Sequence, residues 1–408
     1  MPRTSFINAK IFDGSRSDYL DESVVVVDND GIVAVERTLG HAGAGEVIDV
    51  RGQTLMPGLI DAHCHVLGSS LRVTDTETQP LTYVAGYASK MLGHALDCGF
   101  TTVRDVGGGD LGIARAVEDR LIKGPRVFFA GRVLSMTGGH GDFRDPFSSI
   151  GACACSAEGR IAVICDGADA VRAAAREELR RGAHCIKIML SGGVLSPTDP
   201  LWMDQFTDAE VSAAVEEAAR RRKYVAAHCH PASSIERAAK LGVRTIEHAT
   251  LIDEPSAAAV KAAGAYVVPT TIIVRALLED AKSGLLPAWA GAKLEEVSDS
   301  SLRGLEIMDR QGLKIGFGTD LLGHLHIHQA REFTVRREVQ SAAAILRSAT
   351  SVNAEILMEP KLGKIQPGCY ADILVVDGDP LRDIGVLAQE GRSLTAIMKA
   401  GEFVKLRL

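Results

Sequence analysis

Apolar and polar positions follow one repeating pattern through the middle of the chain. From about residue 55 to residue 350, a short β-branched apolar run is followed by a loop and then by a longer segment rich in Ala, Glu and Arg, with apolar positions three or four apart. This pattern predicts βα units. The expected strands cover residues 55–65, 101–106, 126–134, 185–190, 224–230, 245–250, 266–272 and 314–320, and the clearest helices cover 168–181, 207–222, 233–241 and 329–349.

Eight alternating units favour a closed (β/α)8 TIM barrel over an open doubly wound sheet. An open sheet would call for a phosphate-binding Gly-x-Gly-x-x-Gly after the first strand, and no such motif is present there. The chain ends instead predict short strands at 5–12, 23–28, 32–36, 371–377, 396–399 and 403–406. We therefore expect a barrel domain at 57–356 and a small β-sandwich domain built from 1–56 and 357–408.

Composition agrees with an ordinary globular protein. The 408 residues are 46% hydrophobic and 24% charged, which is enough to bury a large core. The net charge of -7 is spread along the chain without a basic run, so we expect no nucleic-acid partner. The N-terminal region lacks the apolar stretch of a signal peptide, and no segment approaches the ~20 apolar residues that span a bilayer. A cytoplasmic protein without membrane contact is expected.

The eight cysteines are scattered and do not form a disulfide framework. Cys153, Cys155 and Cys165 lie close together in the sequence, but the paired C-x2-C spacing of a structural metal site is missing. Free thiols are therefore the favoured interpretation.

The first expected barrel strand ends in His63 and His65. Because side chains alternate along a strand, both imidazoles should point to the same side. An isolated His-x-His is equally consistent with packed or surface histidines. However, reactive side chains gather at the carboxyl ends of barrel strands, and His228, His248 and Asp320 stand at or near three further strand ends. Together these residues predict a metal site.

Lys187 is a charged residue inside an apolar expected strand. A buried lysine needs a partner or loses its proton, because an unpaired buried charge is costly. A salt bridge or an outward-facing ammonium would satisfy it. The alternative is that its neutral amine is carboxylated by carbon dioxide, which creates an anionic ligand able to bridge two metals.

Several runs resemble the amidohydrolase superfamily. They are residues 56–65 (MPGLIDAHCH), the lysine at 187 with 191–193 (SGG), the histidines at 228 and 248, and 318–320 (GTD). Within the superfamily, residues 137–140 (TGGH), 186–189 (IKIM) and 318–323 (GTDLLG) resemble the Xaa-Pro dipeptidase and imidazolonepropionase-like subgroup. The resemblance covers nearly the whole chain, including residues 367–377.

The resemblance implies a two-metal centre with six ligands. His63, His65 and Asp320 would bind the more buried metal, His228 and His248 the second, and carboxylated Lys187 would bridge both. Zinc suits such a nitrogen and oxygen shell, although manganese, cobalt or iron would also fit. The two metals would hold a bridging hydroxide for attack on a carbonyl. Asp320 would then pass a proton to the leaving amine, unless it acts purely as a ligand.

Three further residues are candidates for substrate contact. His140 follows two glycines and could hold an oxyanion or a carboxylate, although an exposed loop histidine is the alternative. His230 stands where dipeptidase relatives have a tyrosine, which puts specificity for proline in doubt. Arg275 could meet a carboxylate or form a surface ion pair. For His324, His326 and His328 a solvated loop is favoured over a metal or substrate role.

These features favour a homo-oligomeric enzyme that acts on a small molecule. The expected reaction is hydrolysis of an amide to an amino acid with a free carboxylate, in a dipeptide or in an N-acyl amino acid such as an ochratoxin-like N-acyl phenylalanine. A ring-opening hydrolase acting on cyclic amides stays an alternative. A one-metal deaminase is disfavoured because Pro231, and no glutamate, stands third after His228. A non-catalytic metal-binding barrel is disfavoured because all six ligands are present.

Overall fold

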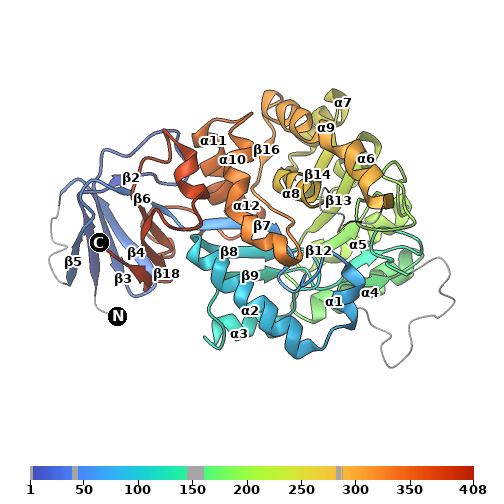
Figure 1. Cartoon of the computed structure of the whole chain (residues 1–408), viewed down its shortest axis with the longest axis horizontal. Helices are drawn as coiled ribbons and strands as arrows, with labels where there is room; N and C mark the ends of the chain where they lie inside the picture. Colours follow the sequence, from blue (N-terminus) through green and yellow to red (C-terminus); the bar gives the residue numbers. More distant parts are fainter. Residues whose placement is uncertain (1–2, 39–44, 145–159, 282–285, 287) are drawn as a thin grey trace.

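The computed structural model describes residues 3–38, 45–144, 160–281, 286 and 288–408. Sheets from the two chain ends lie together on one side of the molecule, where both termini are found, and the middle of the chain forms the larger part beside them (Figure 1).

The middle of the chain is an α/β fold of parallel strands. A sheet with the order β7-β8-β9 and a sheet with the order β11-β10-β12-β13-β14-β15-β16 make up this part. The strands are β7 (Leu59–Cys64), β8 (Phe100–Asp105), β9 (Arg126–Phe129), β10 (Val133–Ser135), β11 (Ala162–Ile164), β12 (Ile186–Met189), β13 (Val225–Pro231), β14 (Thr245–Leu251), β15 (Tyr266–Val268) and β16 (Lys314–Ile315).

Backbone hydrogen bonds link the two sheets on both sides. Ala62 N donates to Phe317 O at 2.8 Å, which joins the first strand to the segment after the last one. On the other side, His184 N donates to Phe129 O at 2.8 Å, just before β12 begins. The strands thus form a continuous ring, as a (β/α)8 barrel requires.

Helices connect and cover these strands. In α2, the residues Val84, Ala88, Met91 and Ala95 are buried at helical spacing, so one apolar face packs on the core. The α-helices are α1 (Val73–Thr78), α2 (Leu81–Asp97), α3 (Leu111–Glu118), α4 (Ala168–Arg180), α5 (Asp208–Arg220), α6 (Ala232–Lys240), α7 (Glu254–Ala263), α8 (Thr271–Ala281), α9 (Ala288–Arg310), α10 (Glu332–Arg336), α11 (Ala342–Arg347) and α12 (Asn353–Ile356). Segments of other helix types are η1 (Gly323–Arg331), η2 (Ser348–Val352) and η3 (Ile384–Ala388).

The chain ends build two sheets, with the orders β4-β3-β1-β5 and β19-β18-β17-β6-β2. Phe6 and Val25 of the first sheet and Ile373 and Met398 of the second share one buried apolar cluster. This packing agrees with the expected β-sandwich, which stays an interpretation, as do the boundaries 1–56, 57–356 and 357–408. The strands are β1 (Thr4–Ile7), β2 (Lys10–Ile11), β3 (Val24–Asp28), β4 (Gly31–Glu36), β5 (Glu46–Asp49), β6 (Thr54–Pro57), β17 (Ile373–Val376), β18 (Leu394–Lys399) and β19 (Glu402–Leu406).

Several expected elements differ from those observed. The strands expected at 5–12 and 126–134 each divide, into β1 and β2 and into β9 and β10, and those expected at 266–272 and 314–320 end early, as β15 and β16. The strand expected at 55–65 divides at Gly58 into β6 and β7, which belong to different sheets. A Cβ at Gly58 would lie 2.1 Å from Thr101 Oγ1, so the chain crosses between the sheets at a point that only glycine fits. The single helix expected at 329–349 is wrong. The chain breaks after α10, and Ser341 caps a new helix by accepting a hydrogen bond from Ala344 N.

Two other expectations can be compared with the structure. The described cysteines, including Cys165, are free and buried, while Cys153 and Cys155 lie outside the described residues. Among the helices of the described part, none combines the length and the apolar character needed to cross a bilayer.

Candidate metal centre and active site

One pocket collects nearly all the predicted site residues. It has a volume of about 940 Å³, including space open to solvent, and lies at the carboxyl ends of the parallel strands. The site residues that line it are His63, His65, His140, Lys187, His228, His230, His248 and Asp320.

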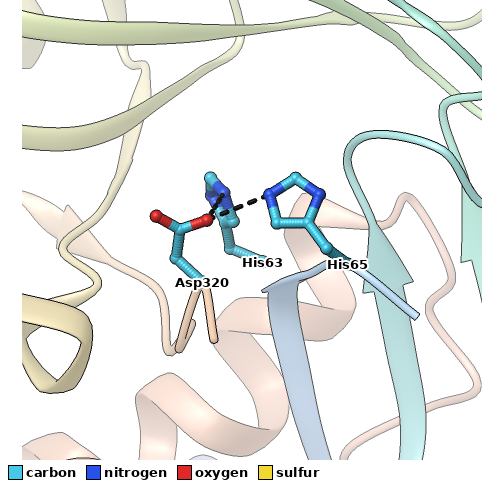
Figure 2. A group of neighbouring side chains, drawn as sticks. All are labelled: His63, His65 and Asp320. Atoms are coloured by element: carbon cyan, nitrogen blue, oxygen red, sulfur yellow. Dashed lines mark hydrogen bonds and ion pairs between the residues drawn. The ribbon is translucent and has the colours of Figure 1, made fainter. Parts of the chain in front are cut away.

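His63 and His65 both reach the carboxylate of Asp320, as Figure 2 shows. Asp320 Oδ1 lies 3.2 Å from His63 Nε2 and 3.0 Å from His65 Nε2. The two histidines therefore point to the same side of β7, as strand alternation predicts. Burial alone would raise the pKa of Asp320, but His63 and His65 hold it well below its usual range. The carboxylate is thus ionised at neutral pH.

The backbone is strained at two candidate ligands, His248 inside β14 and Asp320 in the segment after β16. His248 has a φ of 65° and Asp320 a φ of 56°, in the left-handed region that residues other than glycine rarely adopt. The left-handed backbone at His248 changes the direction in which its side chain points. Glu247 and His248 are neighbours on β14, yet both lie against the ring of His63. Regular alternation would send them to opposite faces.

The other candidate ligands surround the same space. The ring of His248 lies 4.7 Å from that of His228 and 4.8 Å from that of His63, measured between centroids. Burial lowers the pKa of both His228 and His248 well below the usual range, so both rings are neutral. The side chain of Lys187 is buried in the pocket wall. Burial lowers its pKa as well, and within the described residues no hydrogen bond or ion pair holds its amine.

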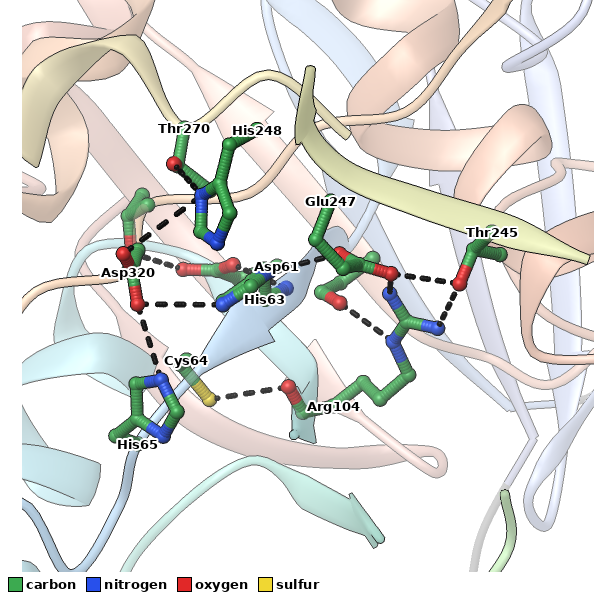
Figure 3. Close-up of polar contacts among 12 residues, drawn as sticks. Asp61, His63, Cys64, His65, Arg104, Thr245, Glu247, His248, Thr270 and Asp320 are labelled. Atoms are coloured by element: carbon green, nitrogen blue, oxygen red, sulfur yellow. Dashed lines mark hydrogen bonds and ion pairs between the residues drawn. The ribbon is translucent and has the colours of Figure 1, made fainter. Parts of the chain in front are cut away.

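A buried charge network lies behind His63 (Figure 3). Glu247 Oε2 lies 2.7 Å from His63 Nδ1, and Glu247 Oε1 accepts from Arg104 Nη2 at 2.9 Å and from Thr245 Oγ1 at 2.6 Å. Arg104 and Glu247 are both fully buried. Burial would raise the pKa of Glu247, but the charge of Arg104 and the hydrogen bond from His63 hold it well below its usual range.

Two further buried carboxylates hold the first strand and its neighbour. Asp61 accepts from Thr319 Oγ1 at 2.7 Å and from Gln329 Nε2 at 2.8 Å, so it ties β7 to the segment that carries Asp320. Asp105 accepts from the backbone N–H groups of Val66 and Gly107. These contacts fix the chain on both sides of His65.

Arg104 and Glu247 were not among the predicted site residues, although the sequence contains a signal for them. Both are charged residues inside expected barrel strands, as Lys187 is, and the same argument of costly buried charge selects them. Asp199, which lies 3.4 Å from His140 Nδ1, and Lys293, which lies 3.7 Å from Asp199, carry no such signal, because their neighbours in space are distant in sequence.

His140 and His230 extend the site beyond the candidate ligands. The ring of His140 stacks on His228 with centroids 4.3 Å apart, and its Nδ1 lies 2.6 Å from Ser196 Oγ. His230 Nδ1 lies 3.0 Å from Thr250 Oγ1. Burial, followed by the charge of His140, lowers the pKa of His230 to about 3. Both rings present imidazole nitrogens beside the candidate ligands.

The rest of the pocket wall is largely apolar. One part of it comes from the loop after β12, from α8 and from α9, and this part contains Val194, Leu195, Ile273, Leu277, Leu294 and Val297. Apart from Lys187, no lysine or arginine of the described residues lines the pocket. A ligand would therefore meet imidazoles at one end and aliphatic side chains at the other.

Arg275 is not among the pocket residues. It lies on α8 and forms an ion pair with Glu338 at 2.7 Å, with both side chains about 40% exposed. This is the surface ion pair that the sequence offered as the alternative, and its position gives no support to a substrate contact.

His324 pairs with Asp280 and is exposed. His326 is different from the expected solvated residue, because it packs behind the site, with Nε2 3.2 Å from His65 O.

The donor set fits a divalent metal. Within the described chain, ligand atoms of His63, His65 and Asp320 lie within 4.8 Å of one another. Imidazole nitrogen and carboxylate oxygen are the ligands that zinc and similar metals prefer. A protonated Lys187 in the same pocket would repel a cation, whereas its neutral amine, favoured by burial, can be carboxylated to an anion.

Comparison with known proteins places these features in context. Residues 54–404 match the amidohydrolase family. Ochratoxinase from Aspergillus niger is 33% identical over 370 residues, which cover 87% of this chain and 76% of that protein. A prolidase solved with N-methylphosphonate-L-proline matches with a TM-score of 0.96 and 43% identity, covering 99% of this chain and 100% of its own. A Xaa-Pro dipeptidase with bound methionine matches with a TM-score of 0.89 and 29% identity, covering 99% and 100%.

Proposed function

Because the chain belongs to the amidohydrolase family, we propose that it hydrolyses an amide bond between an acyl or aminoacyl group and an amino acid with a free carboxylate. The substrate would be a dipeptide or an N-acyl amino acid. One observation carries this proposal: the pocket joins the six candidate ligands and two further imidazoles to an apolar wall. The names of the relatives, ochratoxinase and prolidase, support amide hydrolysis.

In this proposal two divalent metals bind the ligand set. His63, His65 and Asp320 would hold one, His228 and His248 would hold the other, and Lys187, carboxylated by carbon dioxide, would supply a ligand to both. Zinc suits these donors. When bound, two such metals lower the pKa of water and polarise a carbonyl group.

The chain's own residues supply the proton transfer and the orientation. Asp320 is ionised and faces the pocket, so its carboxylate can accept a proton from water and pass it to the leaving amine. His140 and His230 line the pocket, and we expect their ring nitrogens to contact the carbonyl oxygen and the substrate carboxylate. The apolar wall excludes water and receives the side chain of the substrate.

The wall favours a hydrophobic or aromatic group over a charged one. Leu277, Leu294 and Val297 offer dispersion contacts and no hydrogen bonds, so a charged side chain would lose its hydration without compensation. Because His230 replaces the tyrosine that the resemblance leads us to expect, we favour a hydrophobic or aromatic amino acid only weakly over proline. An N-acyl phenylalanine such as an ochratoxin-like compound fits these conditions.

The test compares a free-acid substrate with its amide. We would first assay a library of dipeptides and N-acyl amino acids for release of the C-terminal residue, and then amidate the carboxylate of the best substrate. The amide should lose about 1.5–3 kcal/mol in kcat/KM, the range for a hydrogen bond to a charged group. Equal rates for acid and amide, or opening of cyclic amides alone, would overturn the proposal and favour the ring-opening hydrolase.

A further inference from the structure

We propose that Lys293, Asp199 and Ser196 form a positioning chain that orients His140 toward the pocket. The inference rests on the proposed function only for the kinetic role of His140. Lys293 lies on α9, Asp199 and Ser196 lie in the loop after β12, and His140 follows β10, so the chain joins three separate segments.

The contacts of His140 hold its Nδ1 edge and its backbone. Nδ1 lies 2.6 Å from Ser196 Oγ and 3.4 Å from Asp199 Oδ2, and His140 N donates to Gln205 Oε1 at 3.0 Å. Gln205 Nε2 in turn donates to Asp199 Oδ2 at 3.4 Å. One buried carboxylate therefore connects to both the ring and the backbone of His140.

The faces of the imidazole are also fixed. One face stacks on His228. At Gly193, an added Cβ would lie 2.2 Å from His140 Cε1, so the ring packs directly on the loop backbone. With both faces covered and Nδ1 engaged, Nε2 is the nitrogen left for a ligand. The contacts with the loop thus turn the Nε2 edge of His140 toward the pocket.

Lys293 holds this loop in place. Its ammonium donates to Gly193 O at 2.8 Å, to Ser196 O at 2.7 Å and to Asp199 O at 2.6 Å. A lysine ammonium has three donors, and these three carbonyls use them all. Lys293 therefore cannot bind a substrate carboxylate unless it releases the loop, and its role is positional.

Lys293 also balances a buried charge. Asp199 is fully buried, and in the described residues its Oδ1 has no hydrogen-bond partner. Lys293 Nζ lies 3.7 Å from that oxygen. Burying a carboxylate oxygen that has neither a hydrogen bond nor a countercharge is costly. The positive charge of Lys293 therefore stabilises the ionised Asp199 that contacts His140.

The same lysine ties two walls of the pocket together. Val194 and Leu195 belong to the loop whose carbonyl groups Lys293 binds. Leu294 and Val297 lie near Lys293 on α9, and all four side chains line the pocket. The position of His140 and the shape of the apolar wall thus depend on one set of hydrogen bonds.

A kinetic cycle tests whether Asp199 and Ser196 act through His140. We expect Asp199→Ala and Ser196→Ala each to lower kcat/KM by roughly 10–100-fold, as loss of a carboxylate that orients a functional histidine does. In the His140→Ala background the same changes should have almost no further effect, because the group they orient is gone. Equal factors in both backgrounds would overturn the proposal.

Lys293→Met should weaken kcat/KM in the same way, with part of the loss restored by Lys293→Arg, which keeps the charge. Lys261→Met is the matched control. Lys261 also lies on a helix and donates to one backbone carbonyl, Gln311 O, but it is exposed and away from the pocket. We expect it to leave kcat/KM unchanged. A loss in Lys261→Met equal to that in Lys293→Met would overturn the role of Lys293.

A second readout does not depend on catalysis. In protein labelled with ¹⁵N-histidine, the Nδ1–H signal of His140, identified by its loss in His140→Gln, should exchange slowly with solvent. It should exchange faster or shift in Ser196→Ala, which changes one hydroxyl and keeps the carboxylate. An unchanged signal in both Ser196→Ala and Asp199→Ala would overturn the positioning chain. If no amide is cleaved, the proposed function fails while this measurement still decides the inference.

Discussion

Replacing Glu247 by glutamine should destabilise both the fold and the metal site. The carboxylate receives three hydrogen bonds, from His63 Nδ1 on one oxygen and from Arg104 and Thr245 on the other. A glutamine of the same shape turns one of these acceptors into an NH₂ donor. If the amide NH₂ faces Arg104, a donor faces a donor; if it faces His63, that ring must accept at Nδ1 and move its proton to Nε2, the atom proposed to bind the metal. In either orientation Arg104 stays buried without a countercharge.

The size of the effect follows from this burial. Arg104 and Glu247 are both 0% exposed, so water cannot replace the lost charge. Removing one partner of a buried ion pair costs about 3–5 kcal/mol of folding free energy. Because Glu247 also orients His63, metal affinity should fall by roughly 10–100-fold, the usual effect of losing a carboxylate behind a ligating histidine.

Denaturant unfolding of the chelated protein measures the first effect, and metal titration of the chelated protein measures the second. Glu177→Gln is the matched control, since Glu177 pairs with Arg180 and Arg181 on the exposed face of α4 and should matter little. Adding Arg104→Met to Glu247→Gln should cost less than the two separate changes together, because no lone charge remains. If Glu247→Gln unfolds at the same denaturant concentration as Glu177→Gln, the reasoning is refuted.

Three further predictions concern the metal content, Lys187 and acid stability. The purified protein should contain close to two divalent metals per chain by elemental analysis. Lys187→Ala should lose most activity and part of the metal, with partial rescue by short carboxylic acids, and full activity of that variant would contradict a carboxylated lysine. Burial, and then the charge of Lys223, lower the pKa of His184 from 6.5 to about 4. Between these values the unfolded chain binds a proton that the folded chain does not, so this histidine makes stability fall as the pH drops from 6.5 to 4. His184→Gln should show a smaller loss of denaturant midpoint over that interval than the unchanged protein, and equal losses would contradict the assignment.

The parts of the fold that could be predicted are those set by local pattern. Strands β12, β13 and β14 are apolar runs bounded by polar loops, and the structure places each where the pattern predicts it. The division at Gly58 could not be foreseen, because the contact that requires glycine is made by Thr101 on a different strand. The break between α10 and α11 depends on Ser341, whose capping role is visible only once the chain turns.

The site divides in the same way. His63 and His65 follow from strand alternation, which acts over two residues. His248 does not, since alternation would point it away from Glu247, and only the left-handed backbone at this position brings both toward His63. Strain of this kind, typically about 1–3 kcal/mol for each residue, persists only where surrounding contacts enforce it. No sequence pattern reports those contacts.

The partners behind the imidazoles also determine which nitrogen each histidine can offer to a metal. A carbonyl oxygen only accepts, so His65 carries its proton on Nδ1, which faces Gly107 O at 2.9 Å. His63 likewise carries its proton on Nδ1, toward the ionised Glu247. Nε2 is therefore the nitrogen that each ring would offer to a metal, and it is the atom of each that lies beside Asp320 Oδ1.

His228 has the opposite arrangement. Its Nε2 faces Gly192 O at 3.1 Å, so the proton sits on Nε2 and the lone pair on Nδ1. Gly192 lies in the loop after β12, next to Gly193, whose carbonyl oxygen accepts a hydrogen bond from Lys293. The nitrogen that His228 offers thus depends on the same loop that orients His140. A change at Lys293 should consequently disturb the metal proposed for His228 and His248 before the one proposed for His63, His65 and Asp320, because His63 and His65 donate instead to Glu247 and to Gly107 O.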